Sequence, residues 1–201
     1  ELERVLERGV FAAAEQLYGL TFTPRADLRG WNADTRVFEV HDEDGGAVGL
    51  YLLDPYARPN KRGGAWMHPL VEQNDLLGQA PVVCNNLNVT RPSQGEPTLM
   101  TFDEVETFFH EFGHALHGLL SQVRHPSVSG PNVERDFVEF PSQVNEMWIL
   151  WPEVLDHYRR RFQHVLVDEY QDTNKVQNEL ILQLAGEHHN VCIVGDSDQC
   201  L

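Results

Sequence analysis

The amino-acid sequence predicts an α+β fold, mainly helical with a small antiparallel sheet, followed by a short α/β segment. Three observations lead to this prediction. Apolar side chains recur at three- and four-residue spacing in residues 2–18 and 101–123, which is typical of amphipathic helices. Two short apolar runs flank a glycine-containing turn. After about residue 158 the pattern changes to a buried strand, a helix and a second buried strand.

The first part of the chain is predicted to form one helix and a hairpin. Residues 2–18 place apolar side chains on one helical face among charged neighbours. Residues 36–40 alternate between polar and apolar types, and residues 47–53 are apolar, so both are expected to be strands. The turn between them, residues 42–46, contains two glycines, which tolerate positive φ and favour a tight hairpin.

The middle of the chain contains the strongest helix signal. Residues 54–80 are rich in Pro, Gly, Asn and Arg and predict loops, whereas residues 81–89 predict a strand. Thr101 and Glu104 have the spacing of a capping box, in which each side chain binds a backbone amide at the helix start. The helical pattern then runs to about Val123.

The C-terminal part is predicted to contain one more helix and then a different architecture. A helix is expected from about residue 136 to 150, despite Pro141. Residues 164–168 form an apolar run that ends in an acid, residues 175–184 have a helical pattern, and residues 191–195 form another apolar run. A strand, a helix and a strand in this order are typical of a parallel α/β unit.

Composition limits the class of protein. The 201 residues suit the two domains that we expect, residues 1–158 and 159–201. A net charge of −16 argues against a broad basic surface for nucleic acid. No apolar run approaches the ~20 residues that span a bilayer, and no signal peptide is expected at the first residues. The three cysteines are widely spaced and predict neither disulfides nor a CxxC metal site, so we expect a cytoplasmic protein.

The segment from His110 to His114 has the pattern HExxH on the predicted central helix. Two histidines four residues apart present their imidazoles on one helical face, and Glu111 is placed to take a proton from a zinc-bound water. A hydrolytic zinc site needs three protein ligands and one open position for water. Residues 134–139 supply acidic candidates for the third ligand, and we predict that it is Glu139.

Two further acids are placed to orient the ligands. Glu106 lies one turn before His110 and could accept its free N–H, and Asp136 could do the same for His114. A solvated helix face explains these two acids equally well. The HExxH pattern fixes only three positions and also occurs by chance in ordinary helices. The helix cap, Gly113 and the downstream acids favour the zinc site over that alternative.

Three longer segments resemble the thimet oligopeptidase family, in particular its bacterial peptidyl-dipeptidase and oligopeptidase A branches. They are residues 53–66, 108–117 and 136–143. The resemblance covers about residues 1–158 and implies a mainly helical, zincin-like metallopeptidase segment with a small sheet beside one zinc ion. The residues implied as zinc ligands are His110, His114 and Glu139, with Glu111 as the general base.

The same resemblance implies a cytosolic enzyme that cuts short peptides, as a metalloendopeptidase or a peptidyl-dipeptidase. Members of that family are several times longer than 201 residues. They continue after the zinc site with a helical region whose Tyr and His groups bind substrate, and nothing in this sequence matches that region. An inactive fragment is therefore the alternative.

The tail resembles a different family. Residues 167–174 and 194–199 each follow an apolar run, and they resemble motifs II and III of DNA helicases of the UvrD, PcrA and Rep type over about residues 160–201. The residues that this resemblance implies are Asp168 as a magnesium ligand, Glu169 as a catalytic base and Gln199 near the γ-phosphate. The sequence has no GxxxxGK[ST] loop, so neither ATP nor nucleic acid is an expected ligand, and we expect a helicase fragment without ATPase function.

Overall fold

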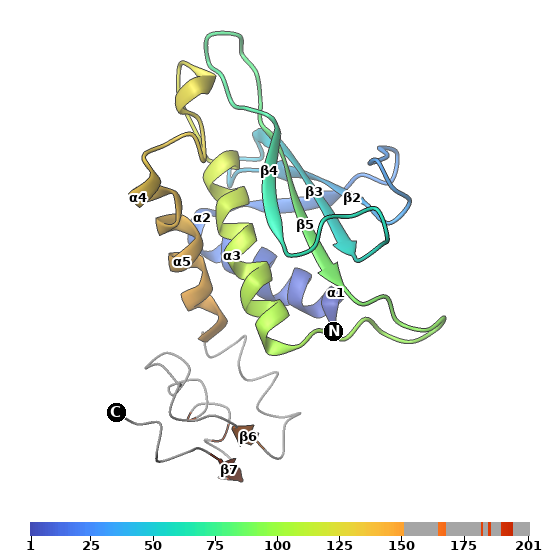
Figure 1. Cartoon of the computed structure of the whole chain (residues 1–201). Coiled ribbons are helices and arrows are strands. Elements are labelled where there is room, and N and C mark those ends of the chain that lie inside the picture. Colours follow the sequence, from blue (N-terminus) through green and yellow to red (C-terminus); the bar gives the residue numbers. More distant parts are fainter. Residues whose placement is uncertain (151–164, 168–181, 183–184, 186–189, 195–201) are drawn as a thin grey trace. The chain divides into compact units, whose positions relative to one another are not determined.

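The computed structural model describes residues 1–150, 165–167, 182, 185 and 190–194. Two compact units make up the chain, Glu1–Trp148 and Ile149–Leu201. The larger unit is a sheet with helices packed against it (Figure 1). No helix among the described residues is long and apolar enough to cross a membrane.

The sheet of the larger unit has five strands in the order β1-β2-β3-β5-β4. The strands are β1 (Thr21–Pro24), β2 (Arg36–His41), β3 (Ala47–Tyr56), β4 (Trp66–Val71) and β5 (Val82–Val89). Strand β2 pairs antiparallel with β3, which confirms the predicted hairpin. After β3 the chain passes to the outer edge, forms β4 and returns to insert β5 beside β3. Strands β3 and β5 therefore run parallel, while β4 is antiparallel to β5.

The α+β class is confirmed, but the expected small antiparallel sheet in a mainly helical fold is wrong. The sheet is mixed, and two of its strands, β1 and β4, are missing from the sequence-based prediction. Both are edge strands and both contain a proline, Pro24 and Pro69. Proline is tolerated there because one side of an edge strand makes no ladder hydrogen bonds. The same residue type that indicated loops is thus compatible with the edges of this sheet.

The N-terminal helix is confirmed over its predicted length. It consists of α1 (Leu2–Val5), a π-helical segment η1 (Leu6–Phe11) and α2 (Ala12–Tyr18), which follow one another directly. Gly19 ends it in the left-handed conformation, with φ of 68°. The apolar face of this helix lies on the sheet, with Leu6 and Val10 fully buried.

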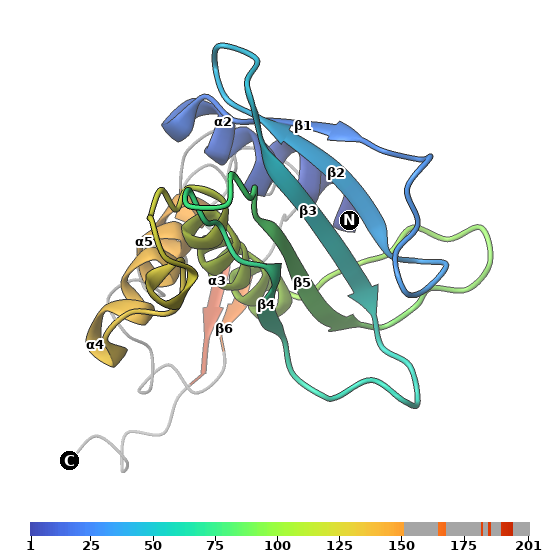
Figure 2. The ribbon, with the colours of Figure 1, turned by 90° about the horizontal axis from the view of Figure 1, so that it is seen from above.

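Helix α3 (Phe102–Leu119) carries the HExxH segment. Its predicted capping box is formed, since the Glu104 amide donates to Thr101 Oγ1 at 3.2 Å and the Thr101 amide donates to Glu104 Oε2 at 2.7 Å. The helix packs on the same face of the sheet as α1 and α2 (Figure 2). Phe112, inside the motif, lies 5.3 Å from the Tyr51 ring and 5.9 Å from the Phe11 ring. The zinc motif is therefore anchored in an aromatic core shared by the sheet and the N-terminal helix.

The predicted helix over residues 136–150 is divided into shorter pieces. A short 3-10 turn, η2 (Pro126–Val128), precedes α4 (Arg135–Val138), α5 (Phe140–Glu146) and the 3-10 turn η3 (Met147–Leu150). Pro141 lies in the first turn of α5, where its missing N–H costs no helical hydrogen bond. A new helix therefore begins at this point, and Glu139 lies at the junction of α4 and α5.

Helix α5 packs tightly against α3 because residue 113 is a glycine. A Cβ at Gly113 would lie 2.6 Å from Ser142 Cα and 2.8 Å from the Pro141 carbonyl oxygen. Both are backbone atoms of α5 and could not move aside separately. The absence of a side chain at Gly113 thus sets the distance between the two helices.

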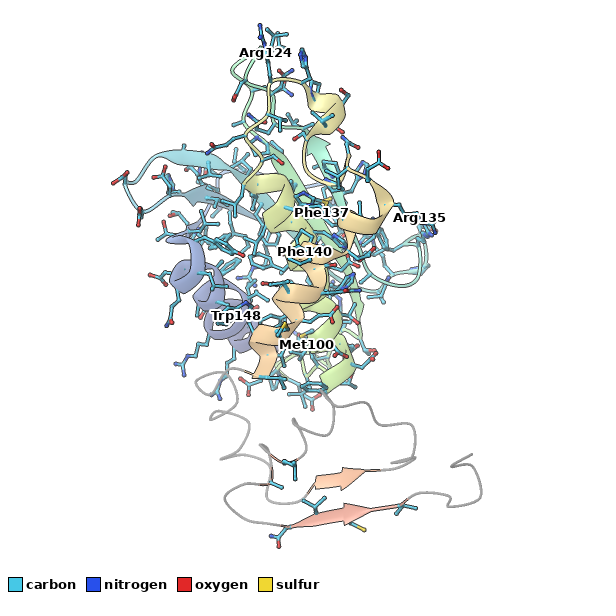
Figure 3. All side chains as sticks on the ribbon, turned by 90° about the vertical axis from the view of Figure 1, so that its left-hand side faces the viewer. Met100, Arg124, Arg135, Phe137, Phe140 and Trp148 are labelled. Carbon is cyan, nitrogen blue, oxygen red and sulfur yellow. The ribbon has the colours of Figure 1, made fainter. Side chains whose placement is uncertain are left out.

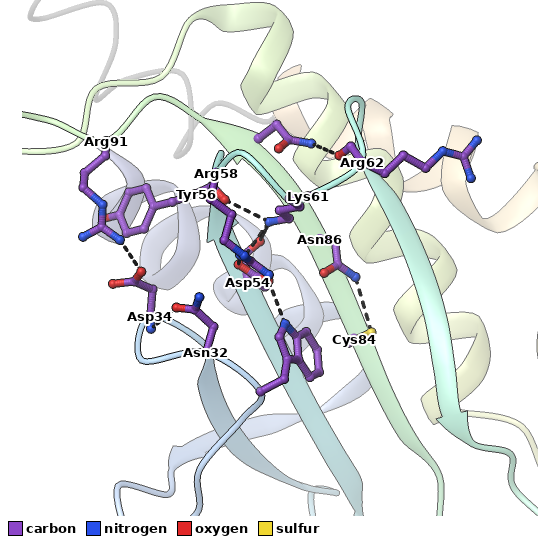
Figure 4. Close-up of polar contacts among 12 residues, drawn as sticks. Asn32, Asp34, Asp54, Tyr56, Arg58, Lys61, Arg62, Cys84, Asn86 and Arg91 are labelled. Carbon is purple, nitrogen blue, oxygen red and sulfur yellow. Dashed lines mark hydrogen bonds and ion pairs between the residues drawn. The ribbon is translucent and has the colours of Figure 1, made fainter.

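A network of buried charges holds the loop between β3 and β4 (Figure 4). Asp54 is fully buried and accepts two bonds from the Arg58 guanidinium, at 2.8 and 2.7 Å. The Lys61 ammonium lies 3.0 Å from the same carboxylate, and the Trp31 ring N–H donates to it at 2.8 Å. Lys61 also donates to the carbonyl oxygens of Asp54 and Tyr56.

In the smaller unit the described residues form two short strands, β6 (Val165–Val167) and β7 (Val191–Ile193). They pair in parallel, which confirms the parallel pairing expected for this segment. Most of the predicted helix over 175–184 lies outside the described residues. Asp168, Glu169 and Gln199 lie outside them as well.

Candidate metal centre

Three side chains from two parts of the chain bring ligand atoms to one point. His110 and His114 lie one turn apart on α3, and their Nε2 atoms are 3.2 Å apart. Glu139 Oε2 lies 3.2 Å from each of these nitrogens. The three atoms therefore form a nearly equilateral triangle, and His110, His114 and Glu139 are grouped as a possible metal-binding cluster.

The size of this triangle fits a tetrahedral zinc ion. Zinc–ligand bonds of about 2.0 Å place neighbouring tetrahedral ligand atoms about 3.3 Å apart. The observed separations of 3.2 Å match that edge within a tenth of an ångström or so. Two imidazole nitrogens and one carboxylate oxygen are also a donor set that zinc accepts, and they leave the fourth tetrahedral position open.

Burial keeps the His114 imidazole in the form that binds metal. It lowers the pKa of His114 below the ordinary 6.5, although the Glu139 carboxylate opposes this shift. A neutral imidazole can offer Nε2 to a cation only if the proton is on Nδ1. His114 Nδ1 is buried and has no partner among the described residues. The predicted partner, Asp136, lies in α4, but its side chain is outside the described residues.

The His110 ring has an orienting acid, but it is not the predicted one. His110 Nδ1 makes a hydrogen bond with Glu146 Oε1, so Glu146 and not Glu106 holds this ring. Glu106 is close enough to Glu146 for their carboxylates to repel each other. Its pKa is raised by burial and then by that neighbouring carboxylate. Glu146 projects from the end of α5, and only the packing of α5 on α3 brings it to His110.

Glu111 lies beside the triangle and is held at both ends. Burial raises the pKa of its carboxyl, while His110 and a backbone hydrogen bond from Met67 lower it. Its carbonyl oxygen accepts a bond from the Asn85 side-chain amide at 2.7 Å. A carboxylate with a raised pKa is a better proton acceptor than an exposed one, so the electrostatics suit the predicted general base.

Glu139 has a support that the sequence did not reveal. The Ser142 hydroxyl lies 3.0 Å from Glu139 Oε2 and 2.8 Å from its carbonyl oxygen. Ser142 is fully buried on the side of α5 that meets Gly113. The carboxylate of Glu139 itself is half exposed. Its neighbours Phe137 and Phe140 stack on each other, and both are exposed on the side of the molecule that Figure 3 shows.

The site opens into a cavity of about 290 Å³ between α3, the segment around Glu139 and strand β4. Trp66 and Met67 of β4 line it, together with His110, Glu111, His114 and Glu139. A larger hollow of about 690 Å³ is lined by residues of segment 24–38, and none of the site residues lines it. The ligand triangle therefore faces the edge strand of the sheet.

Sequence reasoning missed the residues that position the ligands. Glu146 follows Glu139 by seven residues, two helical turns, and this spacing of acids was a signal that both could face α3. Nothing local marks Asn85, because its contact with Glu111 joins segments 26 residues apart. Ser142 follows Glu139 by only three residues, and this helical spacing was a local signal that its hydroxyl could reach that ligand.

Comparison with known proteins gives a consistent result for the larger unit. The family model described as Peptidase family M3 matches residues 1–185. The chain is 47% identical over 163 residues to dipeptidyl carboxypeptidase of Escherichia coli (strain K12), an alignment that covers 81% of this chain and 24% of that protein. It is 46% identical over 151 residues to oligopeptidase A of the same strain, covering 73% of this chain and 22% of that protein.

A plant relative extends the comparison. The organellar oligopeptidase A of Arabidopsis thaliana is 42% identical over 159 residues, covering 73% of this chain and 20% of that protein. The chain thus spans about a quarter or less of the curated relatives it matches.

The family match also bears on the tail. It runs to residue 185 and so passes the predicted boundary at residue 158. These comparisons give the expected helicase segment no support. The match includes the ligand triangle, the glutamate beside it and the strand that faces them, so the geometry and the sequence agree on one assignment. The chain belongs to peptidase family M3.

Proposed function

We propose that this chain carries the zinc-dependent catalytic centre of a peptidase that hydrolyses short peptides. The observation that supports this most directly is the triangle of His110 Nε2, His114 Nε2 and Glu139 Oε2, with edges of 3.2 Å, beside the half-buried Glu111. Relatives named dipeptidyl carboxypeptidase and oligopeptidase A match the segment that contains it.

The chain's own residues divide the work as follows. His110, His114 and Glu139 hold the zinc ion, and Glu146 and Ser142 orient two of these ligands. When bound, zinc polarises the scissile carbonyl and makes water at the site more acidic. Glu111 accepts the proton that the attacking water loses and then delivers it to the leaving amine.

Substrate binding is proposed along the outer edge of β4. This strand is the last in the sheet order, so one side of its backbone pairs with no other strand among the described residues. An extended peptide can add to such an edge through main-chain hydrogen bonds. Trp66 and Met67 line the cavity beside His110 and Glu111, so a peptide on this edge would pass the metal ligands.

One pair of substrates can distinguish the two possible modes of cleavage, dipeptidyl and internal. The names of the relatives describe both a dipeptidyl carboxypeptidase and an oligopeptidase. A peptide with a free C-terminus and the same peptide amidated at that end distinguish removal of C-terminal dipeptides from internal cleavage. Only the first activity should be lost on amidation.

The test of the proposed function is zinc-dependent cleavage by the chain and by Glu111→Gln. A glutamine keeps the size of the side chain but cannot accept the proton, and loss of a general base costs roughly 10²–10⁴-fold in rate. We expect the variant to retain one zinc per chain and to lose cleavage of a short quenched peptide. Glu7→Gln, an exposed acid of η1, is the control and should leave both unchanged.

Undiminished cleavage by Glu111→Gln would remove Glu111 from the mechanism. Loss of zinc together with activity would assign Glu111 to holding the site. A zinc-loaded chain that cleaves no peptide at all would show that activity needs segments that the longer relatives have in addition.

A cytoplasmic location and a tail without ATPase function remain predictions. Two Arabidopsis thaliana relatives are named probable cytosolic oligopeptidase A and organellar oligopeptidase A, so relatives of this chain occur in more than one compartment. For the tail, the parallel pairing of β6 with β7 is compatible with a helicase-like unit but does not identify one. Magnesium-dependent nucleotide binding that is lost in Asp168→Asn would instead support the alternative of an ATP-binding, helicase-like tail.

A further inference from the structure

Two polar side chains lie inside the apolar core between the sheet and α3. Tyr51 on β3 and Asn85 on β5 are both fully buried. The Tyr51 hydroxyl donates to Asn85 Oδ1 at 2.9 Å, and Asn85 Nδ2 donates to the carbonyl oxygen of Glu111 at 2.7 Å. A buried amide is tolerated only when its hydrogen bonds are made, so each group in this chain of bonds depends on the next.

The Glu111 carbonyl, like that of Phe109, accepts a side-chain amide bond although it belongs to a helix. It lies within α3, where a carbonyl oxygen ordinarily accepts from the amide four residues later. A carbonyl has a second lone pair, and Asn85 is placed to use it. The sheet therefore contacts α3 through a directional bond at the residue proposed as the general base, in addition to apolar packing.

The other end of Glu111 is bound by the strand next to β5. Met67 of β4 lines the same cavity as Glu111, and its backbone amide lowers the pKa of the Glu111 carboxyl. Met67 and Asn85 are directly opposite each other in the β4–β5 ladder. One register pair of the sheet thus holds the Glu111 main chain through Asn85 and places Met67 beside the Glu111 side chain.

We propose that Asn85, supported by Tyr51 and paired with Met67, is a positioning residue that fixes Glu111 relative to strand β4. This proposal rests on the proposed function for the catalytic role of Glu111. The clamp, by which we mean the contacts of Tyr51, Asn85 and Met67 that lead to Glu111, can be tested without that role. If Asn85 is replaced, α3 keeps its apolar packing and the bond from Asn145 to Phe109, but it loses the directional bond at Glu111 itself. The Glu111 carboxylate should then lose its fixed distance to the Met67 amide.

The neighbouring residue supplies a matched control. Asn86 is also buried and belongs to the same strand, but successive residues of a strand point to opposite faces of the sheet. Its side-chain amide makes a weak contact with Cys84 Sγ at 3.5 Å and belongs to the face away from α3. Asn85→Leu and Asn86→Leu therefore remove the same group from comparably buried positions, and only the first touches Glu111.

The experiment uses the zinc-loaded chain, with metal content and thermal stability recorded for each variant. Hydrogen exchange at the Met67 amide and the carboxyl carbon-13 signal of Glu111, identified by its absence in Glu111→Gln, report the clamp directly. We expect Asn85→Leu to keep one zinc, to speed Met67 exchange about tenfold or more and to move the Glu111 signal. Asn86→Leu should change neither. Tyr51→Phe should act in the same direction as Asn85→Leu but less strongly, and it replaces that variant if Asn85→Leu does not fold.

If the chain is active, the kinetics of peptide cleavage provide a second measurement. A misplacement of a catalytic group by about an ångström can cost up to roughly a hundredfold in rate, so kcat should fall in Asn85→Leu while KM stays within about twofold. Equal effects of Asn85→Leu and Asn86→Leu on Met67 exchange and on the Glu111 signal would overturn the proposal. Undiminished cleavage by Glu111→Gln would count against the proposed function, while the exchange and carbon-13 comparison would still decide whether Asn85 positions Glu111.

Discussion

Two clusters of charged side chains in the larger unit are built in opposite ways. Around Asp54, one buried carboxylate meets an arginine, a lysine and an indole N–H, and every group has a partner within the cluster (Figure 4). Around His110, the ion pairs of the described residues join the carboxylates of Glu139 and Glu146 only to the two histidines. Every charge of the first cluster is paired within that cluster. In the second cluster, three possible metal-ligand atoms surround a point that no described side chain occupies.

The difference separates a structural cluster from a binding site. Buried charges need opposite charges or hydrogen bonds, and the Asp54 cluster supplies both from its own residues. The ion pairs of the His110 cluster join two carboxylates to two histidines and to no lysine or arginine, and three possible metal-ligand atoms lie 3.2 Å from one another. A divalent cation bound to the three atoms satisfies that arrangement, and two imidazoles with one carboxylate are a donor set that zinc accepts.

The largest expected effect is loss of the metal. His114→Ala removes one corner of the triangle and should reduce bound zinc from one per chain to near zero, because a two-ligand site binds zinc poorly. Metal content after dialysis measures this. Asp54→Asn serves as the comparison and should retain its zinc. Equal zinc loss in both variants would mean that metal binding only reports folding.

The next effect concerns stability without metal. Asp54→Asn leaves the buried Lys61 ammonium and the Arg58 guanidinium without their acid, and breaking a buried ion pair typically costs about 3–5 kcal/mol. Denaturant unfolding of the zinc-free proteins measures the free energy of unfolding. The control is Asp34→Asn, which removes a more exposed pair with Arg91 and should cost less than about 1 kcal/mol. A smaller loss for Asp54→Asn than for the control would contradict a structural role.

A smaller effect is expected at the residue that orients His110. Glu146→Gln keeps a hydrogen-bond acceptor beside His110 Nδ1 but removes its charge, and loss of such a partner typically weakens metal binding by roughly 10–100-fold. Competition with a zinc chelator measures the affinity. Glu106→Gln, the partner predicted from sequence, should have the weaker effect. The reverse order would restore Glu106 as the orienting acid.

The smallest expected effect is the dependence of the free energy of unfolding on pH. Burial alone would raise the pKa of Asp54, but bonds from Arg58, Trp31 and Lys61 outweigh it and hold that pKa below the ordinary 3.8. A carboxyl whose folded pKa is depressed stabilises the fold above the unfolded pKa and loses that contribution as pH falls through the folded value. The stability difference between zinc-free wild type and Asp54→Asn should therefore be constant from pH 7 to about pH 5 and narrow below about pH 4. A difference that does not change with pH would show that the carboxylate charge contributes nothing.

Local rules of sequence determined much of the metal-bearing helix. The capping box of Thr101 and Glu104, the four-residue spacing of His110 and His114, and the N-terminal helix all depend on neighbours within a few residues. The hairpin of β2 and β3 depends on its glycine turn in the same way. Such features can be predicted because their hydrogen bonds and faces repeat with a fixed period along the chain.

The tertiary structure alone decided what surrounds that helix. The return of the chain inserts β5 between β3 and β4, so the proline-containing strand β4 becomes the edge beside the metal ligands. Packing of α5 on Gly113 brings Glu139 and Glu146 to the histidines, and the β4–β5 register brings Asn85 and Met67 to Glu111. These contacts join residues 25 to 44 positions apart, and chain connectivity fixes no such distance before the sheet and helices have packed.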